Sequence, residues 1–268
     1  MPFIQAGDIR IFYEMTGEGH RLLYISGTGG DLRNPLGPLQ SPLPKHFNML
    51  AYDQRGLGQT DKPDRPYTMR DYADDAARLL NAVGWQRCHV LGYSFGGMVA
   101  QEFAIRHPER VEKLVLCVTS PGGAGGASYP LHEMARLGPE ERARRGIALA
   151  DLRRTPEWQA AHPDEVSQFV GQALATERAH AHEPGWAEGR ARQLEARRGH
   201  DTFDRLGKIS APTLVCCGRY DGIALAATQE RMAARIPNAE LRMFEGGHLF
   251  VLQDRSAYPA IIEWLKAG

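Results

Sequence analysis

Short apolar runs that alternate with amphipathic segments constrain the fold of this chain most strongly. Residues 111–119, VEKLVLCVT, are rich in aliphatic and β-branched side chains and have the length of a strand. Residues 69–83, MRDYADDAARLLNAV, carry apolar side chains at helical spacing and stop before Gly84, which suits a helix C-terminus. Apolar strands that alternate with helices are typical of a parallel sheet covered by helices. We therefore expect an α/β fold.

The same alternation continues along most of the chain. The first fifteen residues predict an antiparallel hairpin around a Gly7-Asp8 turn. Further strands are expected at 21–26, 47–53, 89–93, 212–217 and 240–244, and further helices at 96–107, 227–236 and 258–266. Together these segments predict a mostly parallel eight-stranded sheet with an N-terminal antiparallel hairpin.

One long interval has no strand pattern. It opens with the flexible sequence PGGAGGASYP and continues as short helical segments rich in Arg and Glu, interrupted by four prolines. We interpret residues 122–206 as a helical insertion between the sixth and seventh strands, with the core formed by 1–121 and 207–268. Its charged side chains are expected to lie on the solvated outer faces of the helices.

Composition excludes several classes of protein. The 268 residues include 32 basic and 32 acidic side chains, and this balance argues against a nucleic-acid partner. No apolar run approaches the ~20 residues of a membrane span, and the N-terminus does not resemble a signal peptide. Four cysteines fall in or beside apolar runs without metal-site spacing, which predicts buried reduced thiols, no metal site and a cytoplasmic location: Cys88, Cys117, Cys216 and Cys217.

Residues 91–97, LGYSFGG, predict a nucleophile. They contain G-x-S-x-G around Ser94, between an apolar run and an amphipathic run. A strand followed by a sharp turn and a helix is the context in which this motif exposes a reactive serine hydroxyl. Because serine is a poor nucleophile at neutral pH, Ser94 needs a base within hydrogen-bond reach and an acid that orients this base.

Two strand ends offer these partners. His248 lies in the loop after a late strand, in LRMFEGGHLF, and Asp221 follows the run TLVCCGRYDG. The carboxyl ends of parallel strands meet at one edge of a sheet, so both side chains are expected beside Ser94. The other histidines have simpler interpretations, and no set of partners at ligand spacing makes His180 and His182 a metal site.

The order Ser94, Asp221, His248, together with the loop YDQRGLGQT, resembles the α/β-hydrolase family. This resemblance implies an oxyanion hole formed by the backbone N–H groups of Phe95 and Thr28, and it makes the insertion a cap. The D-x-R-G-x-G loop at 53–58 is interpreted as structural. Most relatives carry His where Ser26 stands, so we expect the Ser26 hydroxyl to support the oxyanion loop and Ser26→Ala to lower kcat more than it raises KM.

The resemblance also implies the reaction. We expect hydrolysis of a carboxylic ester or lactone through an acyl-enzyme, without a cofactor, on a small polar substrate like that of the enol-lactonase-like subgroup. Carbon–carbon hydrolases of the family commonly carry Trp after the catalytic His, where this chain has Leu249. Carbon–carbon cleavage and cofactor-free haloperoxidase or perhydrolase activity remain alternatives, as does, less favoured, a non-catalytic ligand receptor.

Candidate pocket walls come from the insertion, the rim of the sheet and the glycine-rich loop. The sequence does not predict the oligomeric state. The pocket candidates are Gly29, Trp158, Trp186, Ile223 and Leu249, with Met134, Phe169 and Phe250 as further possibilities.

Overall fold

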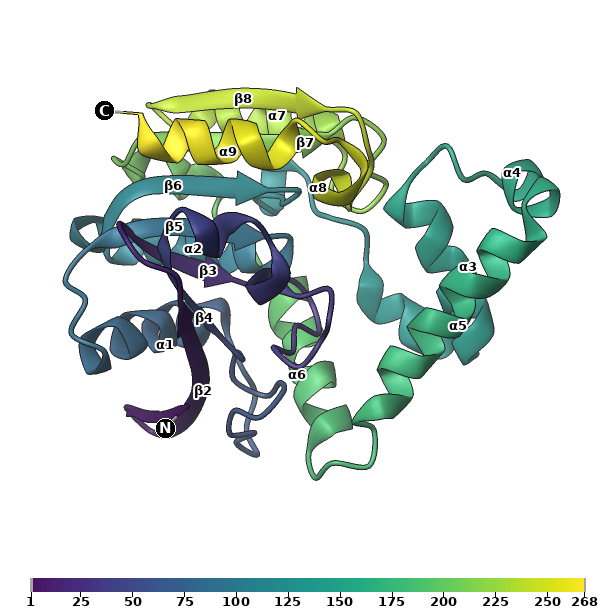
Figure 1. The fold of residues 1–268 in the computed structure, drawn as a ribbon, viewed down its shortest axis with the longest axis horizontal. Helices are drawn as coiled ribbons and strands as arrows, with labels where there is room; N and C mark the ends of the chain where they lie inside the picture. Colours follow the sequence, from purple (N-terminus) through teal and green to yellow (C-terminus); the bar gives the residue numbers. More distant parts are fainter. Residues whose placement is uncertain (1, 268) are drawn as a thin grey trace.

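The computed structural model describes residues 2–267, and its strands form one sheet of eight (Figure 1). In spatial order the strands are β1-β2-β4-β3-β5-β6-β7-β8; β2 pairs antiparallel with β1 and with β4, and all other pairs are parallel. The predicted mixed sheet and N-terminal hairpin are therefore confirmed. The strands are β1 (Phe3–Ala6), β2 (Ile9–Thr16), β3 (Arg21–Ile25), β4 (Asn48–Tyr52), β5 (Cys88–Tyr93), β6 (Val111–Cys117), β7 (Thr213–Gly218) and β8 (Ala239–Phe244).

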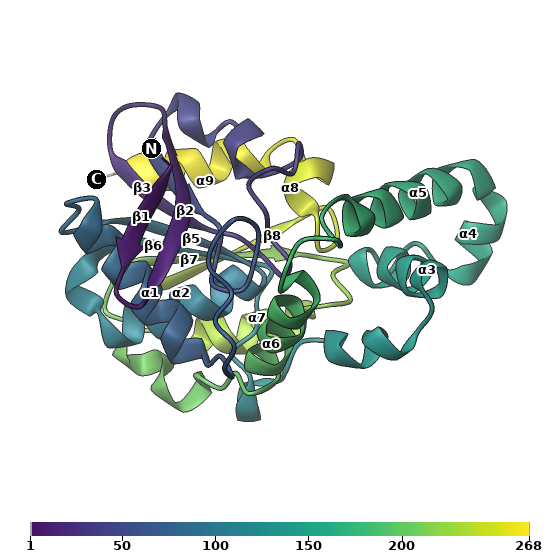
Figure 2. The ribbon, with the colours of Figure 1, turned by 90° about the horizontal axis from the view of Figure 1, so that it is seen from below.

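Helices cover both faces of the sheet (Figure 2). One face packs against α1 (Met69–Ala82), α2 (Phe95–Arg106) and α7 (Ala226–Arg235), and the other packs against α9 (Ala257–Lys266) and the short α8 (Phe250–Gln253). The central strand β5 is buried along almost its whole length, as expected for a strand covered on both faces. This three-layer arrangement holds the carboxyl ends of the strands at a single edge.

The insertion between β6 and β7 consists of helices, as predicted. These are α3 (Pro139–Ala150), α4 (Pro156–Ala161), α5 (Pro163–Ala179) and α6 (Trp186–Arg198). Three of the four prolines that interrupt the sequence pattern are the first residues of α3, α4 and α5, because a missing N–H costs nothing in the first turn of a helix. Helices α3 to α5 project beyond the sheet edge, whereas α6 returns toward the core (Figures 1 and 2).

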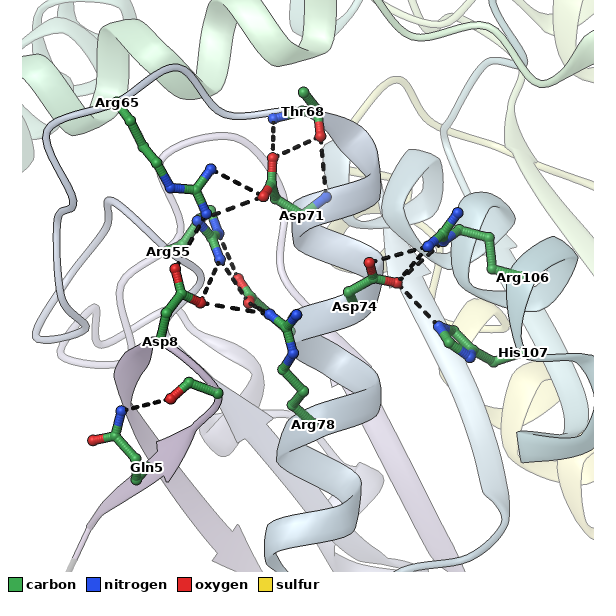
Figure 3. A network of polar contacts seen from close by, with 12 residues as sticks. Gln5, Asp8, Arg55, Arg65, Thr68, Asp71, Asp74, Arg78, Arg106 and His107 are labelled. Carbon is green, nitrogen blue, oxygen red and sulfur yellow. Dashed lines mark hydrogen bonds and ion pairs between the residues drawn. The ribbon is translucent and has the colours of Figure 1, made fainter.

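A buried arginine joins the loop after β4 to α1 and to the β1–β2 turn (Figure 3). The Arg55 side chain is fully buried, and its Nε and Nη2 donate to the two carboxylate oxygens of Asp75 at 2.6 and 2.8 Å. Asp8 and Asp71 lie at 3.7 and 3.9 Å from the same guanidinium. Burial raises the pKa of Asp75, and the hydrogen bonds from Arg55 oppose that rise. These contacts support the structural interpretation of the D-x-R-G-x-G loop.

Two further expectations concern the whole chain. All four cysteines are buried, and none of them forms a disulfide. Among residues 2–267, no helix combines the length and the apolar character needed to cross a membrane.

Candidate active site

Ser94 stands on a strained turn between β5 and α2. Its φ and ψ are 55° and −115°, a conformation that few non-glycine residues adopt. The turn is tight on both sides: a Cβ on Gly92 would lie 2.4 Å from the Gly96 carbonyl oxygen, and a Cβ on Gly96 would lie 2.0 Å from that of Ile25. Both glycines of G-x-S-x-G are therefore required by close backbone approach, and they hold the serine above the sheet edge.

The structure brings His248 and Asp221 to this serine. His248 Nε2 lies 2.9 Å from Ser94 Oγ, and His248 Nδ1 lies 2.9 Å from Asp221 Oδ2. The other Asp221 oxygen accepts the backbone N–H groups of Ile223 and Ala224 at 2.7 and 3.0 Å. All three members of this constellation are more than nine-tenths buried. A carboxylate bonded in this way holds one tautomer of the imidazole, with the free Nε2 directed at the hydroxyl.

One contact from the insertion and one from β5 hold the loop that carries His248 in place. The His248 N–H donates to the carbonyl oxygen of Ala150 at the end of α3 (2.6 Å), and the Tyr93 hydroxyl donates to the His248 carbonyl oxygen (2.5 Å). A Cβ on Gly247 would lie 1.9 Å from the same Ala150 oxygen, so only glycine fits there. The sequence did not indicate this contact, because it depends on how α3 docks.

The loop after β3 lies against the serine. The Cβ position of Gly27 is 3.4 Å from Ser94 Cβ. Among residues 2–267 no acceptor is recorded for the backbone N–H groups of Thr28 and Phe95. Phe95 is the first residue of α2, where backbone N–H groups have no partner within the helix. Two unused donors thus come from the two segments that adjoin the Ser94 hydroxyl.

The support of this loop differs from the expectation. No hydrogen bond is recorded for the Ser26 hydroxyl within the described residues. Instead the Gln54 amide donates to the Ser26 carbonyl oxygen at 2.8 Å, and the Gly29 N–H donates to Gln193 Oε1 of α6 at 2.8 Å. Gln193 lies 164 residues from Gly29 in sequence, and both glutamines are fully buried or nearly so. Sequence reasoning missed both, since Gln54 stands at a variable position of the D-x-R-G-x-G loop and Gln193 belongs to no motif.

An arginine of α6 lies directly above Gly29. A Cβ on Gly29 would be 2.6 Å from Arg190 Nη1, and the Arg190 guanidinium lies 4.6 Å from the centre of the Trp186 ring. Burial lowers the pKa of Arg190, and no carboxylate forms an ion pair with it in the part of the chain that the structure describes. The Arg190 guanidinium therefore lies close to both Gly29, in the loop after β3, and Trp186.

The other candidate wall residues fall into three groups. Ile223 lies two residues after Asp221, and Leu249, which directly follows His248, is 44% exposed at the rim. Trp158 and Phe169 instead pack on the small apolar cluster shared by α3 and α5, where Trp158 stacks on His162. The other two lie elsewhere: Phe250 is buried between Phe244 and Tyr93, and Met134 is buried within the insertion. The sequence marked these side chains as apolar but could not tell packing from lining.

One group of side chains away from the serine offers metal-ligand atoms. His20, His89 and Glu112 present such atoms within 4.8 Å of one another. They precede or begin β3, β5 and β6, so they lie at the amino edge of the sheet, opposite Ser94. Arg87, Lys113 and Lys266 line the same hollow, and this positive charge opposes the binding of a further cation.

Comparison with known proteins places this constellation in a family. A family model described as the alpha/beta hydrolase fold matches residues 20–254. This match, with the sheet order and the turn at Ser94, defines a hydrolase of the α/β class. The chain belongs to the α/β-hydrolase family.

The names of the similar proteins describe several different hydrolase activities. A poly(3-hydroxyalkanoate) depolymerase of Ectopseudomonas oleovorans is 30% identical over 254 residues, which cover 91% of this chain and 84% of the relative. A putative carbamate hydrolase of Variovorax paradoxus is 30% identical over 257 residues, 92% of each chain. The crystal structure of an enol-lactonase from Burkholderia xenovorans superposes with a TM-score of 0.79 at 22% identity, over 99% of this chain and 100% of that one. The fold is thus shared across hydrolases with different substrates.

Proposed function

We propose that this protein is a serine hydrolase that cleaves a carboxylic ester or lactone. The observation that carries the proposal is the continuous chain from Ser94 Oγ through the His248 ring to Asp221, with 2.9 Å at each step. Geometry of this kind lets the imidazole accept the hydroxyl proton while the carboxylate stabilises the resulting imidazolium.

The reaction would proceed in two halves. Ser94 Oγ attacks the acyl carbon as His248 takes its proton, and His248 then returns the proton to the departing alkoxide. Water, activated by the same imidazole, hydrolyses the acyl-enzyme and regenerates the serine. For a lactone the leaving oxygen stays attached to the acyl part through both steps, and the product is a single hydroxy acid.

Negative charge on the carbonyl oxygen requires donors at both tetrahedral stages. The proposed donors are the N–H groups of Thr28 and Phe95, which have no recorded acceptor in the described chain. Removing one donor of this kind typically lowers kcat by ~10²–10³. The positive end of α2 adds to this stabilisation, because the helix begins directly after the serine.

The insertion is proposed to act as the cap over this site. Residues 122–206 would form the cap, and 1–121 with 207–268 the core. In support, the Ala150 carbonyl oxygen accepts the His248 N–H, and Gln193 accepts the Gly29 N–H. Two segments of the insertion therefore contact the loops that carry the proposed base and the proposed oxyanion donor.

The residue after the histidine favours an ester or lactone over a carbon–carbon bond. Leu249 offers no polar group at a position where the family's carbon–carbon hydrolases commonly have Trp. A carbamate, the substrate class in the name of one relative, has a carbonyl that the same serine could attack, so it belongs in any substrate panel.

Turnover of p-nitrophenyl acetate tests the proposal. The wild-type protein should hydrolyse it, and Ser94→Ala should lose roughly 10⁴-fold or more in kcat while keeping the wild-type melting temperature. Ser167→Ala, on an exposed position of α5, is the matched control and should behave as wild type. Equal rates for Ser94→Ala and wild type would refute a serine mechanism.

A further inference from the structure

A second hollow begins one helical turn from the proposed nucleophile. It is a cavity of about 210 Å³ between α2, the segment after β6 and the end of α6. The Met98 N–H donates to the Ser94 carbonyl oxygen at 3.3 Å, so the cavity wall is attached directly to the serine turn. Its wall includes Met98 from α2, and no carboxylate lines it among the described residues. The hydroxyl, imidazole and guanidinium groups in the wall belong to Ser120, Ser128, His132, Arg197, Arg198 and His200.

Arg197 is a buried cation without a counter-charge. The residue is 6% exposed, and its Nη1 and Nη2 donate to two neutral acceptors, the Tyr129 carbonyl oxygen at 2.8 Å and Ser128 Oγ at 2.7 Å. Its Nε is buried and has no partner among residues 2–267, and no ion pair of Arg197 is recorded there. Burial lowers the pKa of Arg197 to about 10, so the group stays charged at neutral pH. An unpaired buried charge is costly, and an anion beside it removes that cost.

Another lining residue of the same cavity supplies a second unused donor. Ser120 is fully buried, and its Oγ has no hydrogen-bond partner within the described chain. The segment is also strained, because Val118, a β-branched residue, has a φ of 45°. Strained backbone persists where the surrounding structure requires a particular placement of the side chains, and it is concentrated at functional sites.

We propose that this cavity binds a carboxylate of the substrate, with the Arg197 guanidinium as counter-charge and the Ser120 hydroxyl as second donor. The preferred substrate is then an ester or lactone whose acyl part carries a carboxylate a few carbons from the reacting carbonyl. A planar guanidinium matches a carboxylate in shape. Arg198 also lines the cavity but is already paired with Glu195, so Arg197 supplies the one uncompensated positive charge. The inference rests on the hydrolase function proposed above.

A matched pair of esters tests it. p-Nitrophenyl hydrogen adipate and p-nitrophenyl hexanoate have acyl chains of equal length and differ in a terminal carboxylate. The wild-type protein should favour the adipate ester by ~10-fold or more in kcat/KM, the worth of one hydrogen-bonded charge. Arg197→Gln should lose ~10- to 100-fold on the adipate ester and remain within about threefold on the hexanoate ester.

Arg192→Gln is the control variant. It removes the same charge from the same helix, but Arg192 contacts Pro63 and Asp64 outside the cavity. This variant should retain the preference of the wild type. Equal losses on both esters in Arg197→Gln would show that Arg197 acts only in packing, and a wild type without preference would overturn the inference while leaving the hydrolase intact.

Failure of the carboxylate site can be distinguished from failure of the proposed hydrolase function. If the wild type hydrolyses neither ester nor p-nitrophenyl acetate, the hydrolase proposal itself fails. If Arg197→Gln does not fold, inhibition of the wild type decides, since the monoamide of adipic acid, which keeps one carboxylate, should inhibit p-nitrophenyl acetate hydrolysis at ~10-fold lower concentration than the uncharged diamide. Equal inhibition by the two compounds would contradict a carboxylate site.

Discussion

At the residue scale, a buried histidine links the stability of the protein to pH. His200 is 6% exposed, and its Nε2 lies 3.1 Å from the Ser120 carbonyl oxygen. Burial, with smaller contributions from the positive charges of Arg205 and Arg197, lowers the pKa of His200 to about 3. An unfolded histidine titrates near ~6.5. Between these two values the unfolded chain binds a proton that the folded chain does not, so stability falls as the pH is lowered from about 6.5.

His200→Gln should remove this part of the acid sensitivity. The glutamine amide can still donate to the Ser120 carbonyl oxygen, but it does not titrate. Below pH 6.5, His200 should lower the free energy of unfolding of the wild type by up to ~1.4 kcal/mol for each pH unit. The variant should not show this decrease. Urea unfolding at pH 6.5, 5.5 and 4.5 measures it, with exposed His182→Gln as control. Parallel pH slopes for His200→Gln and wild type would contradict the assignment.

At the element scale, α6 connects the insertion to the oxyanion loop. The contact is the hydrogen bond from the Gly29 N–H to Gln193, and α6 also carries Arg190 and Arg197 on the side that faces the core. The position of this helix therefore sets both the support of the loop and the charge near the serine. The Ser26 hydroxyl, expected from the sequence to give that support, has no hydrogen-bond partner recorded among residues 2–267.

A pair of substitutions distinguishes the two supports. Gln193→Met keeps the volume but leaves the Gly29 N–H without its acceptor, so kcat should fall roughly three- to tenfold, the effect of a hydrogen bond of about 1 kcal/mol. Ser26→Ala should now stay within about twofold of wild type, which revises the loss in kcat that the sequence predicts. Steady-state kinetics on p-nitrophenyl acetate measure both. A larger loss in Ser26→Ala than in Gln193→Met would restore the serine as the support.

The same contrast shows what the sequence could predict. Ser94, Asp221 and His248 follow strand ends, and the parallel topology that the apolar runs imply already brings such residues to one edge. Gln193, Arg190 and Arg197 reach the site only because α6 returns to the core, and no local pattern specifies that docking. Trp158 and Phe169, predicted as wall candidates, pack on the cluster between α3 and α5. No local pattern specifies this packing either, because an apolar side chain in the insertion packs wherever its neighbouring helices meet.

At the scale of the whole molecule, a buried ion pair holds the amino-terminal half together. Arg55 connects the β4 loop to α1, and Asp8 and Asp71 lie around it (Figure 3). Both charges of the Arg55–Asp75 pair are almost fully buried, so each is stabilised chiefly by the other. The pair lies on the α1 side of the sheet, and its role is in folding.

Arg55→Met should therefore be strongly destabilising without altering the chemistry. The loss of Arg55 leaves the buried Asp75 without its hydrogen-bonded partner and with only the partly exposed Arg78 at 3.6 Å. We expect a cost of about 3–5 kcal/mol in the free energy of unfolding, and adding Asp75→Leu should recover most of it. Burial already raises the pKa of Asp75, so the deficit of the single variant should shrink as the pH falls and the carboxyl becomes protonated. Denaturant unfolding at two pH values and kcat/KM per folded molecule measure these effects. A mild single variant, or a double variant no better than the single, would contradict the pairing.

The central claim, that Ser94 is a nucleophile activated by His248, is tested most directly by covalent labelling. We predict that a fluorophosphonate adds once per chain, that peptide mass mapping locates the adduct on Ser94, and that His248→Asn labels far more slowly. No adduct, an adduct on another residue, or equal labelling rates in His248→Asn and wild type would contradict the account.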